Sequence, residues 1–169
     1  MHRYKIIIQY DGSSFSGWQL QKNRNTVQGE IENALKIISA SEDRIAVHGA
    51  GRTDSGVHAH GQVAHFDLET NIKSSDLCKA INYNTSQDCK IMSLEKVDNN
   101  FESRFDAKKR RYRYQVYTGS SLLYRNQAWL ISDIDIKILE ELIETNISIV
   151  STGPDRKETI DINGTLLNI

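Results

Sequence analysis

The sequence predicts an α+β fold with a mixed, mainly antiparallel sheet, and three observations carry this prediction. Residues 4–10 (YKIIIQY) are rich in β-branched and aromatic residues, which is typical of a strand. Between residues 26 and 40, apolar residues recur at helical spacing. The segments then follow the order strand, helix, strand, strand, helix, strand, which matches a ferredoxin-like split βαβ unit.

Each element has its own local justification. The turn-forming residues 11–14 (DGSS) end the first strand, and Asn25 or Thr26 is a suitable N-cap for a helix that runs to about Ala40. Two strands are expected next, over residues 44–50 and 61–68, then a helix over 75–83 and a strand over 89–97. Alternation predicts a further strand over 110–118 (RRYRYQVYT), and residues 134–144 are helix-like.

At 169 residues the chain fits one domain of ordinary size or two small ones. We expect a first domain over residues 1–131, and a helix with a weakly patterned tail over 132–169. The formal net charge is −1, but 3 of the 21 basic and 8 of the 22 acidic residues follow position 131. Residues 1–131 therefore carry a net charge of +4, which is compatible with a polyanionic partner.

The cysteines and the N-terminus bear on the compartment. Cys78 and Cys89 are the only cysteines and form no CxxC pair, which favours a reduced, intracellular protein over a disulfide scaffold. The apolar run near the N-terminus is too short for a signal peptide or a membrane span. We therefore expect a cytoplasmic protein with no membrane partner.

Residues 51–59 (GRTDSGVHA) separate two predicted strands and place Arg52 two positions before Asp54. In an extended segment such residues point the same way, so both side chains can face one cleft. There an arginine would keep the carboxylate ionised and aimed, as a nucleophile requires. The alternative is structural: an ion pair that stabilises the loop, with Asp54 capping the turn. The residue pair taken alone favours this alternative.

A second charged segment follows the last strand of the βαβ unit. Cations neutralise phosphates and aromatic rings stack on unpaired bases, so cations interleaved with tyrosines suit an RNA-binding surface. The alternative is a half-buried strand with its tyrosines on the core and its arginines in water. The residues concerned are Lys108, Lys109, Arg110, Arg111 and Arg113, with Tyr112 and Tyr114.

Four of the five histidines lie near the loop 51–59, namely His48, His58, His60 and His65. A zinc site needs three or four converging ligands, and the sequence has neither paired cysteines nor the HExxH spacing, so no metal site is predicted. His48 and His65 are expected on strands. Trp18 is interpreted as a core anchor rather than an exposed stacking surface, because large aromatic residues are mostly buried.

Taken together, four segments resemble the tRNA pseudouridine synthase A family. They are YDGSSFSGWQ at 10–19, TVQGEIENAL at 26–35, GAGRTDSGVHAHGQVAHF at 49–66 and FESRFDAKKRRYRYQVY at 101–117. The resemblance implies one half of a pseudouridine synthase fold and isomerisation of uridine to pseudouridine in the anticodon stem-loop of tRNA. It also implies that Asp54 is the catalytic residue, that Arg52 pairs with it and helps displace the base, and that Tyr112 stacks on the uracil. The resemblance implies a homodimer and implies no cofactor.

Members of this family are longer, so the chain is expected to be C-terminally truncated, with an incomplete second half and reduced or no activity. Two further interpretations stay open: a non-catalytic RNA-binding module, and an inactive remnant of the enzyme. A hydrolase that uses Asp54 is disfavoured, because the loop lacks a second carboxylate placed as a general acid.

Overall fold

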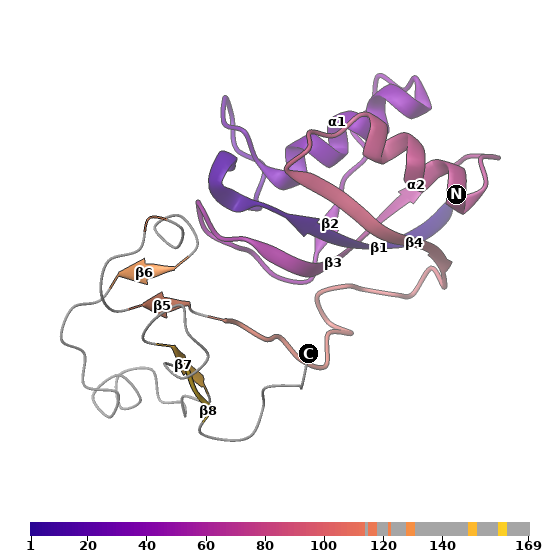
Figure 1. Cartoon of the computed structure of the whole chain (residues 1–169). Coiled ribbons are helices and arrows are strands. Elements are labelled where there is room, and N and C mark those ends of the chain that lie inside the picture. Colours follow the sequence, from indigo (N-terminus) through magenta and orange to yellow (C-terminus); the bar gives the residue numbers. More distant parts are fainter. Residues whose placement is uncertain (114, 118–121, 123–127, 131–148, 152–158, 162–169) are drawn as a thin grey trace. The chain divides into compact units, whose positions relative to one another are not determined.

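The computed structural model describes residues 1–113, 115–117, 122, 128–130, 149–151 and 159–161 (Figure 1). The chain divides into two compact units, residues 1–110 and 111–169, and each is described by itself. The predicted boundary after residue 131 stays a prediction. Among the described residues, no helix combines the length and the apolar character needed to cross a membrane.

The first unit is a four-stranded sheet with two helices on one face (Figure 1). Its elements are β1 (His2–Tyr10), the 3-10 helix η1 (Gly12–Ser14), α1 (Val27–Ser39), β2 (His48–Gly49), β3 (Ala59–Leu68), α2 (Ser74–Tyr83) and β4 (Cys89–Val97). The strand order is β2-β3-β1-β4, and every pairing in this sheet is antiparallel. This is the order of a ferredoxin-like unit, so the predicted α+β fold is confirmed.

The second unit contributes two short strand pairs to the described part of the chain. β5 (Val116–Tyr117) runs parallel to β6 (Trp129–Leu130), and β7 (Ile149–Ser151) runs antiparallel to β8 (Thr159–Asp161). Parallel pairing thus occurs here and not in the four-stranded sheet. The helix expected over residues 134–144 lies outside the described residues.

Alternation along β1 builds the core beneath the helices. Tyr4, Ile6, Ile8 and Tyr10 are buried against the apolar stripe of α1 and α2. Each such side chain contributes about 1.5–3 kcal/mol when it leaves water. The intervening residues of β1 therefore point to the opposite face of the sheet, the face without helices.

The predicted limits of the first helix are confirmed. Thr26 is the N-cap of α1, and its side-chain oxygen accepts a hydrogen bond from the backbone N–H of Gly29 at 3.2 Å. Ala40 ends the helix in the left-handed conformation, with φ of 49°. The second helix also agrees with its prediction to within one residue at its start.

The strand predicted over residues 44–50 is wrong in its extent, because β2 contains 2 residues. Glu32 of α1 accounts for the difference. Its carboxylate accepts hydrogen bonds from the Arg44 guanidinium at 2.7 and 2.8 Å and from the Val47 backbone N–H at 3.0 Å. The Val47 carbonyl accepts from Gln28 at 3.0 Å. These backbone groups are satisfied by helix side chains instead of a neighbouring strand.

The strand predicted over residues 110–118 is also shorter than expected. Within the described part of this segment, β5 consists of Val116 and Tyr117, and residues 110–113 are irregular. Tyr114 and Thr118 lie outside the described residues. Alternation in sequence is therefore not sufficient here, because a strand forms only where a partner supplies the ladder.

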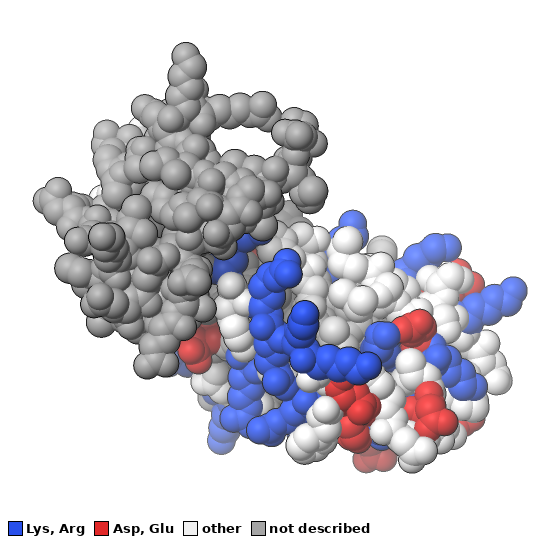
Figure 2. Space-filling model, turned by 90° about the horizontal axis from the view of Figure 1, so that it is seen from below, with Lys and Arg blue, Asp and Glu red and all other residues white. Residues whose placement is uncertain are grey.

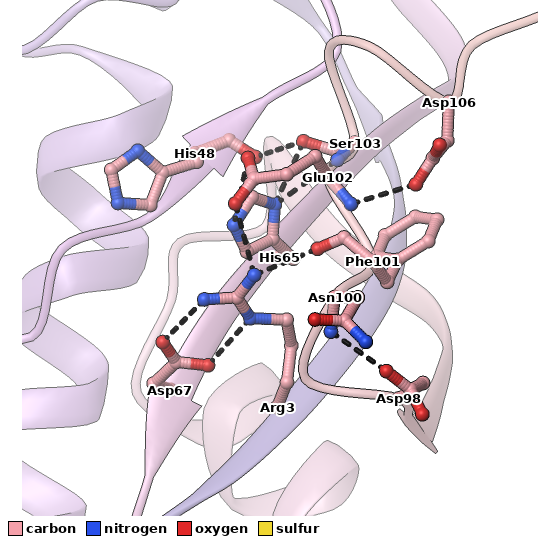
Figure 3. Close-up of polar contacts among 10 residues, drawn as sticks. All are labelled: Arg3, His48, His65, Asp67, Asp98, Asn100, Phe101, Glu102, Ser103 and Asp106. Atoms are coloured by element: carbon pink, nitrogen blue, oxygen red, sulfur yellow. Dashed lines mark hydrogen bonds and ion pairs between the residues drawn. The ribbon is translucent and has the colours of Figure 1, made fainter.

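A polar cluster covers part of the helix-free face of the sheet (Figure 3). The Arg3 guanidinium donates to both carboxylate oxygens of Asp67 at 2.8 Å. It also donates to the Glu102 carboxylate and to the Phe101 carbonyl, each at 2.9 Å. These bonds attach the segment that follows β4 to β1 and β3, and the adjacent guanidinium lowers the pKa of the Asp67 carboxyl.

His65 lies in the same cluster and is 2% exposed. Its Nδ1 lies 3.0 Å from the Ser103 hydroxyl oxygen and accepts a hydrogen bond from the Ser103 backbone N–H at 3.3 Å. Its ring stacks on that of His48, with centroids 5.0 Å apart. Burial lowers the pKa of His65 below the ordinary value of 6.5, while the Glu102 carboxylate opposes this shift.

The buried histidine predicts a loss of stability in mild acid. His65 takes up a proton more readily in the unfolded chain than in the folded one. The contribution of neutral, buried His65 to the free energy of unfolding is therefore complete above about pH 6.5, and it declines as the pH falls toward the lower pKa of the folded state. His65→Asn, whose amide can hydrogen-bond Ser103, should reduce the difference in the free energy of unfolding between about pH 7.5 and about pH 5.5. Urea denaturation measures it, with exposed His60→Asn as the control. An unchanged pH dependence in His65→Asn would contradict the prediction.

Candidate active site

Two loops pack against each other where β1 ends and β3 begins. The loop 51–58 between β2 and β3 lies on residues 11–18, which follow β1. The Trp18 backbone N–H donates to the Thr53 carbonyl at 3.0 Å, and the Gly56 N–H donates to the Phe15 carbonyl at 3.3 Å. The main chain of the loop 51–58 is therefore held at its centre.

Three glycines permit this close approach. A Cβ atom at Gly12 would lie 2.2 Å from the Val57 carbonyl oxygen, and one at Gly17 would lie 2.7 Å from the Thr53 carbonyl oxygen. At Gly49, a Cβ would lie 2.6 Å from the Trp18 ring. Trp18 is 2% exposed, so its interpretation as a core anchor is confirmed.

Thr53 orients the centre of the loop. Its hydroxyl oxygen lies 2.8 Å from the hydroxyl of Tyr10, which is 3% exposed. Burial raises the pKa of the Tyr10 hydroxyl, so this group is neutral at physiological pH. With Thr53 turned inward, its neighbours Arg52 and Asp54 are both exposed. The alternation that predicts one shared direction for Arg52 and Asp54 also predicts the opposite direction for Thr53, but sequence reasoning assigned Thr53 no role.

The alternative interpretation of Arg52 and Asp54, an ion pair that stabilises the loop, is wrong. Among the described residues, no ion pair joins these two side chains. The turn is closed by the main-chain oxygen of Asp54, which accepts from the Val57 N–H at 3.2 Å. The carboxylate is thus exposed on a backbone that other contacts hold in place, which is the arrangement a reacting group requires.

The hydroxyl pair predicts a specific pattern of stability. Thr53→Val should cost about 1–3 kcal/mol, because it leaves the buried Tyr10 hydroxyl without its partner. Thr53→Ser keeps the hydroxyl and should cost less. The double variant Tyr10→Phe with Thr53→Val should lose less than the sum of the single variants, since neither hydroxyl is then left unpaired. Chemical denaturation measures the wild type, the single variants Thr53→Val, Thr53→Ser and Tyr10→Phe, and the double variant, and strictly additive losses would contradict the hydrogen bond.

Arg110 connects the basic segment to the start of the loop. Its guanidinium donates to the Ala50 carbonyl, with Nη2 at 2.8 Å, and to the Arg104 carbonyl at 3.0 Å. The predicted RNA-binding residue Arg110 thus also bonds to the main chain, a role that the sequence did not indicate. Lys108 and Lys109 are exposed beside it. Lys and Arg side chains gather in one dense group on the face shown in Figure 2.

The remaining predicted residues belong to the second unit. Arg111, Tyr112 and Arg113 are exposed, and 64% of Tyr112 is accessible. Exposure of Arg111 and Arg113 agrees with both interpretations of this segment, whereas the exposure of Tyr112 contradicts the half-buried strand at that residue. Stacking of Tyr112 on a uracil beside Asp54 stays a prediction.

The histidines near the loop are distributed over different surroundings. His48 and His65 lie on β2 and β3, as predicted. His58 Nδ1 lies 3.1 Å from an Asp11 carboxylate oxygen and accepts from the Gly12 N–H at 3.2 Å. In the part of the chain that the structure describes, no three His, Cys, Asp or Glu side chains converge as metal ligands.

Comparison with known proteins identifies the family. Residues 6–106 match the model of the family described as tRNA pseudouridine synthase. Proteins named tRNA pseudouridine synthase A are similar: that of Ehrlichia ruminantium (strain Gardel) is 48% identical over 133 residues, covering 76% of this chain and 53% of the relative. That of Ehrlichia chaffeensis is 47% identical over 148 residues, covering 84% and 59%. That of Maridesulfovibrio salexigens is 37% identical over 169 residues, covering 95% and 62%.

The chain thus spans between 53% and 62% of the length of these relatives. The matched residues include the part of β1 from Ile6 onward, α1, the loop 51–58, α2, β4 and the segment 98–106 that follows β4. The two packed loops and the exposed pair on them therefore lie within the matched region. The chain belongs to the tRNA pseudouridine synthase family.

Proposed function

We propose that this chain carries the catalytic loop of a synthase that isomerises uridine to pseudouridine in the anticodon stem-loop of tRNA. The observation that carries the proposal is the exposed Asp54 carboxylate, two positions from exposed Arg52 and without an ion pair among the described residues, on a loop held by Thr53. The relatives that share this region are named tRNA pseudouridine synthase A. The proposed site of action is the cytoplasm, and the proposed assembly is a homodimer.

The reaction needs a group that stabilises a sugar cation. The N1–C1′ bond of uridine breaks, the uracil rotates, C5 bonds to C1′, the C5 proton leaves and N1 takes up a proton. Breaking a glycosidic bond develops positive charge on the ribose, which an ionised carboxylate stabilises or traps covalently. Asp54 has this role in our proposal, and nothing in the reaction demands an external oxidant or reductant.

Access to the target uridine has an energetic cost that the other residues offset. A base inside a stem must leave the stack before an enzyme can act on it. Arg52 is proposed to occupy the place of the displaced base, and Tyr112 to stack on the uracil. Contacts with phosphate groups are assigned to exposed cations: Lys108, Lys109, Arg110, Arg111 and Arg113.

Tritium release tests the proposal directly. Unmodified tRNA labelled with tritium at C5 of uridine should release the label to water on incubation with the protein, because C5 loses its hydrogen when it bonds to C1′. A non-catalytic RNA-binding module is the second candidate, favoured by the exposed basic segment 108–113. It would bind the same tRNA without release, and this outcome would remove the enzymatic proposal.

A further inference from the structure

Phe105 is an exposed aromatic ring on a well-fixed turn. The side chain is 81% exposed. The turn beneath it is closed by hydrogen bonds from the Phe105 and Asp106 N–H groups to the Glu102 carbonyl, at 3.0 and 2.8 Å. The Asp106 carboxylate in turn accepts from the Glu102 N–H at 2.8 Å (Figure 3). The turn has its own internal hydrogen bonds, so the exposure of the ring does not result from a poorly bonded turn.

The turn is also anchored to the sheet. Ser103 is 2% exposed, and its hydroxyl donates to the His48 carbonyl at 2.6 Å (Figure 3). The Arg3 guanidinium also donates a hydrogen bond to the Glu102 carboxylate at 2.9 Å. The cluster that buries Ser103 thus directs Phe105 into water, although burial of this ring would stabilise the fold by about 1.5–3 kcal/mol. An aromatic ring presented in this way is suited to contact a ligand.

The surroundings of the ring are basic. The Arg104 guanidinium carbon lies 6.0 Å from the centroid of the Phe105 ring, within reach of a cation–π contact. Arg110 bonds the Arg104 carbonyl and also the Ala50 carbonyl, two residues before Arg52. Lys108 and Lys109 are exposed on the intervening chain. The turn is therefore tied to the start of the loop 51–58, with cations along the connection.

We propose that Phe105 and Arg104 form a stacking platform for an unpaired nucleotide of the RNA substrate, adjacent to the loop that carries Asp54. An aromatic face with neighbouring cations matches the base and the phosphate of one nucleotide, and such stacking tolerates any base. A protein partner is disfavoured, because the neighbours of the ring would place several charges at an apolar contact. The inference rests on the proposed function and adds a binding site to it.

The test compares three variants with the wild type in their binding of unmodified tRNA. Phe105→Ala should raise the Kd about 5- to 150-fold, because a stacked base contributes about 1–3 kcal/mol. Phe105→Trp should bind as the wild type does. Tyr83→Ala removes another exposed ring, 88% accessible at the end of α2 on the opposite side of the sheet, and should leave the Kd unchanged.

Salt dependence separates stacking from charge. Phe105→Ala should keep the slope of log K against log salt, whereas Arg104→Ala should reduce its magnitude by about 1. A Kd within twofold of the wild type for Phe105→Ala would overturn the platform. So would a change of oligomeric state or a lower melting temperature that accounts for the weaker binding, since the ring would then be a packing surface.

The two proposals can fail separately. If tritium is not released but Phe105→Ala weakens tRNA binding and Tyr83→Ala does not, the platform stands and the catalytic assignment fails. If tritium is released and Phe105→Ala binds like the wild type, the platform is wrong and the catalytic assignment stands.

Discussion

Asp54→Asn should lower pseudouridine formation by at least about a thousandfold, because the amide cannot stabilise or trap the sugar cation as the carboxylate does. The fold should persist, since the carboxylate is exposed and the loop is held through the Thr53 side chain and main-chain bonds. Tritium release from labelled tRNA measures the turnover. The Kd for unmodified tRNA should change by less than about threefold, because phosphate contacts supply most of the affinity.

A matched control separates chemistry from surface charge. Asp43→Asn removes the same charge from an exposed carboxylate in the segment that follows α1, and it should leave turnover unchanged. If Asp54→Asn turned over at the wild-type rate, Asp54 would have no catalytic role. If both variants lost activity equally, the effect would belong to the net charge.

Gly17→Ala should lower the free energy of unfolding by about 2–5 kcal/mol and strongly reduce turnover. Gly17 has φ of 93°, where a side chain is strained, and its Cβ would lie 2.7 Å from the Thr53 carbonyl oxygen. Relief of that clash must move the Thr53 main chain, which positions Asp54. A displacement of about 1 Å at a reacting group can lower the rate about a hundredfold. Chemical denaturation and tritium release measure the two effects.

Gly56→Ala is the comparison that isolates the clash. Gly56 also has a positive φ, of 79°, but a Cβ there would meet nothing within 4 Å. This variant should therefore lose only the strain energy, about 1–2 kcal/mol. Equal losses in the two variants would show that the contact between the two loops contributes little to stability.

Periodicity predicted the elements that pack on the core, and it failed where side chains compete for backbone groups. The first helix begins after its predicted N-cap, Thr26, and ends at Ala40, as predicted. Residues 44–47 look like a strand, but Glu32 and Gln28 bind the main chain of Val47 and prevent pairing there. That competition depends on the distance between a helix and a neighbouring segment, which no window along the sequence contains.

The candidate site was predicted in part. The exposed residues Arg52 and Asp54 were indicated by their position in an extended loop, and their shared direction stays a prediction. Their relation did not: the sequence taken alone favoured an ion pair, and the described residues contain none between them. The exposure of Phe105 could not be predicted, because it follows from the burial of Ser103, whose hydroxyl bonds His48, 55 positions away.

The spacing of residues along the chain was sufficient for the α+β class, the helix limits and the family motif, because these properties depend on local periodicity and on residue type. The folded chain was needed to show that the Thr53 hydroxyl meets Tyr10, 43 positions away, and that Arg110 reaches Ala50 across 60 positions. The first contact exists because the antiparallel sheet brings the end of β1 beside the loop between β2 and β3. Contacts of this kind hold the main chain of the loop that carries Asp54, and they join residues far apart in the sequence.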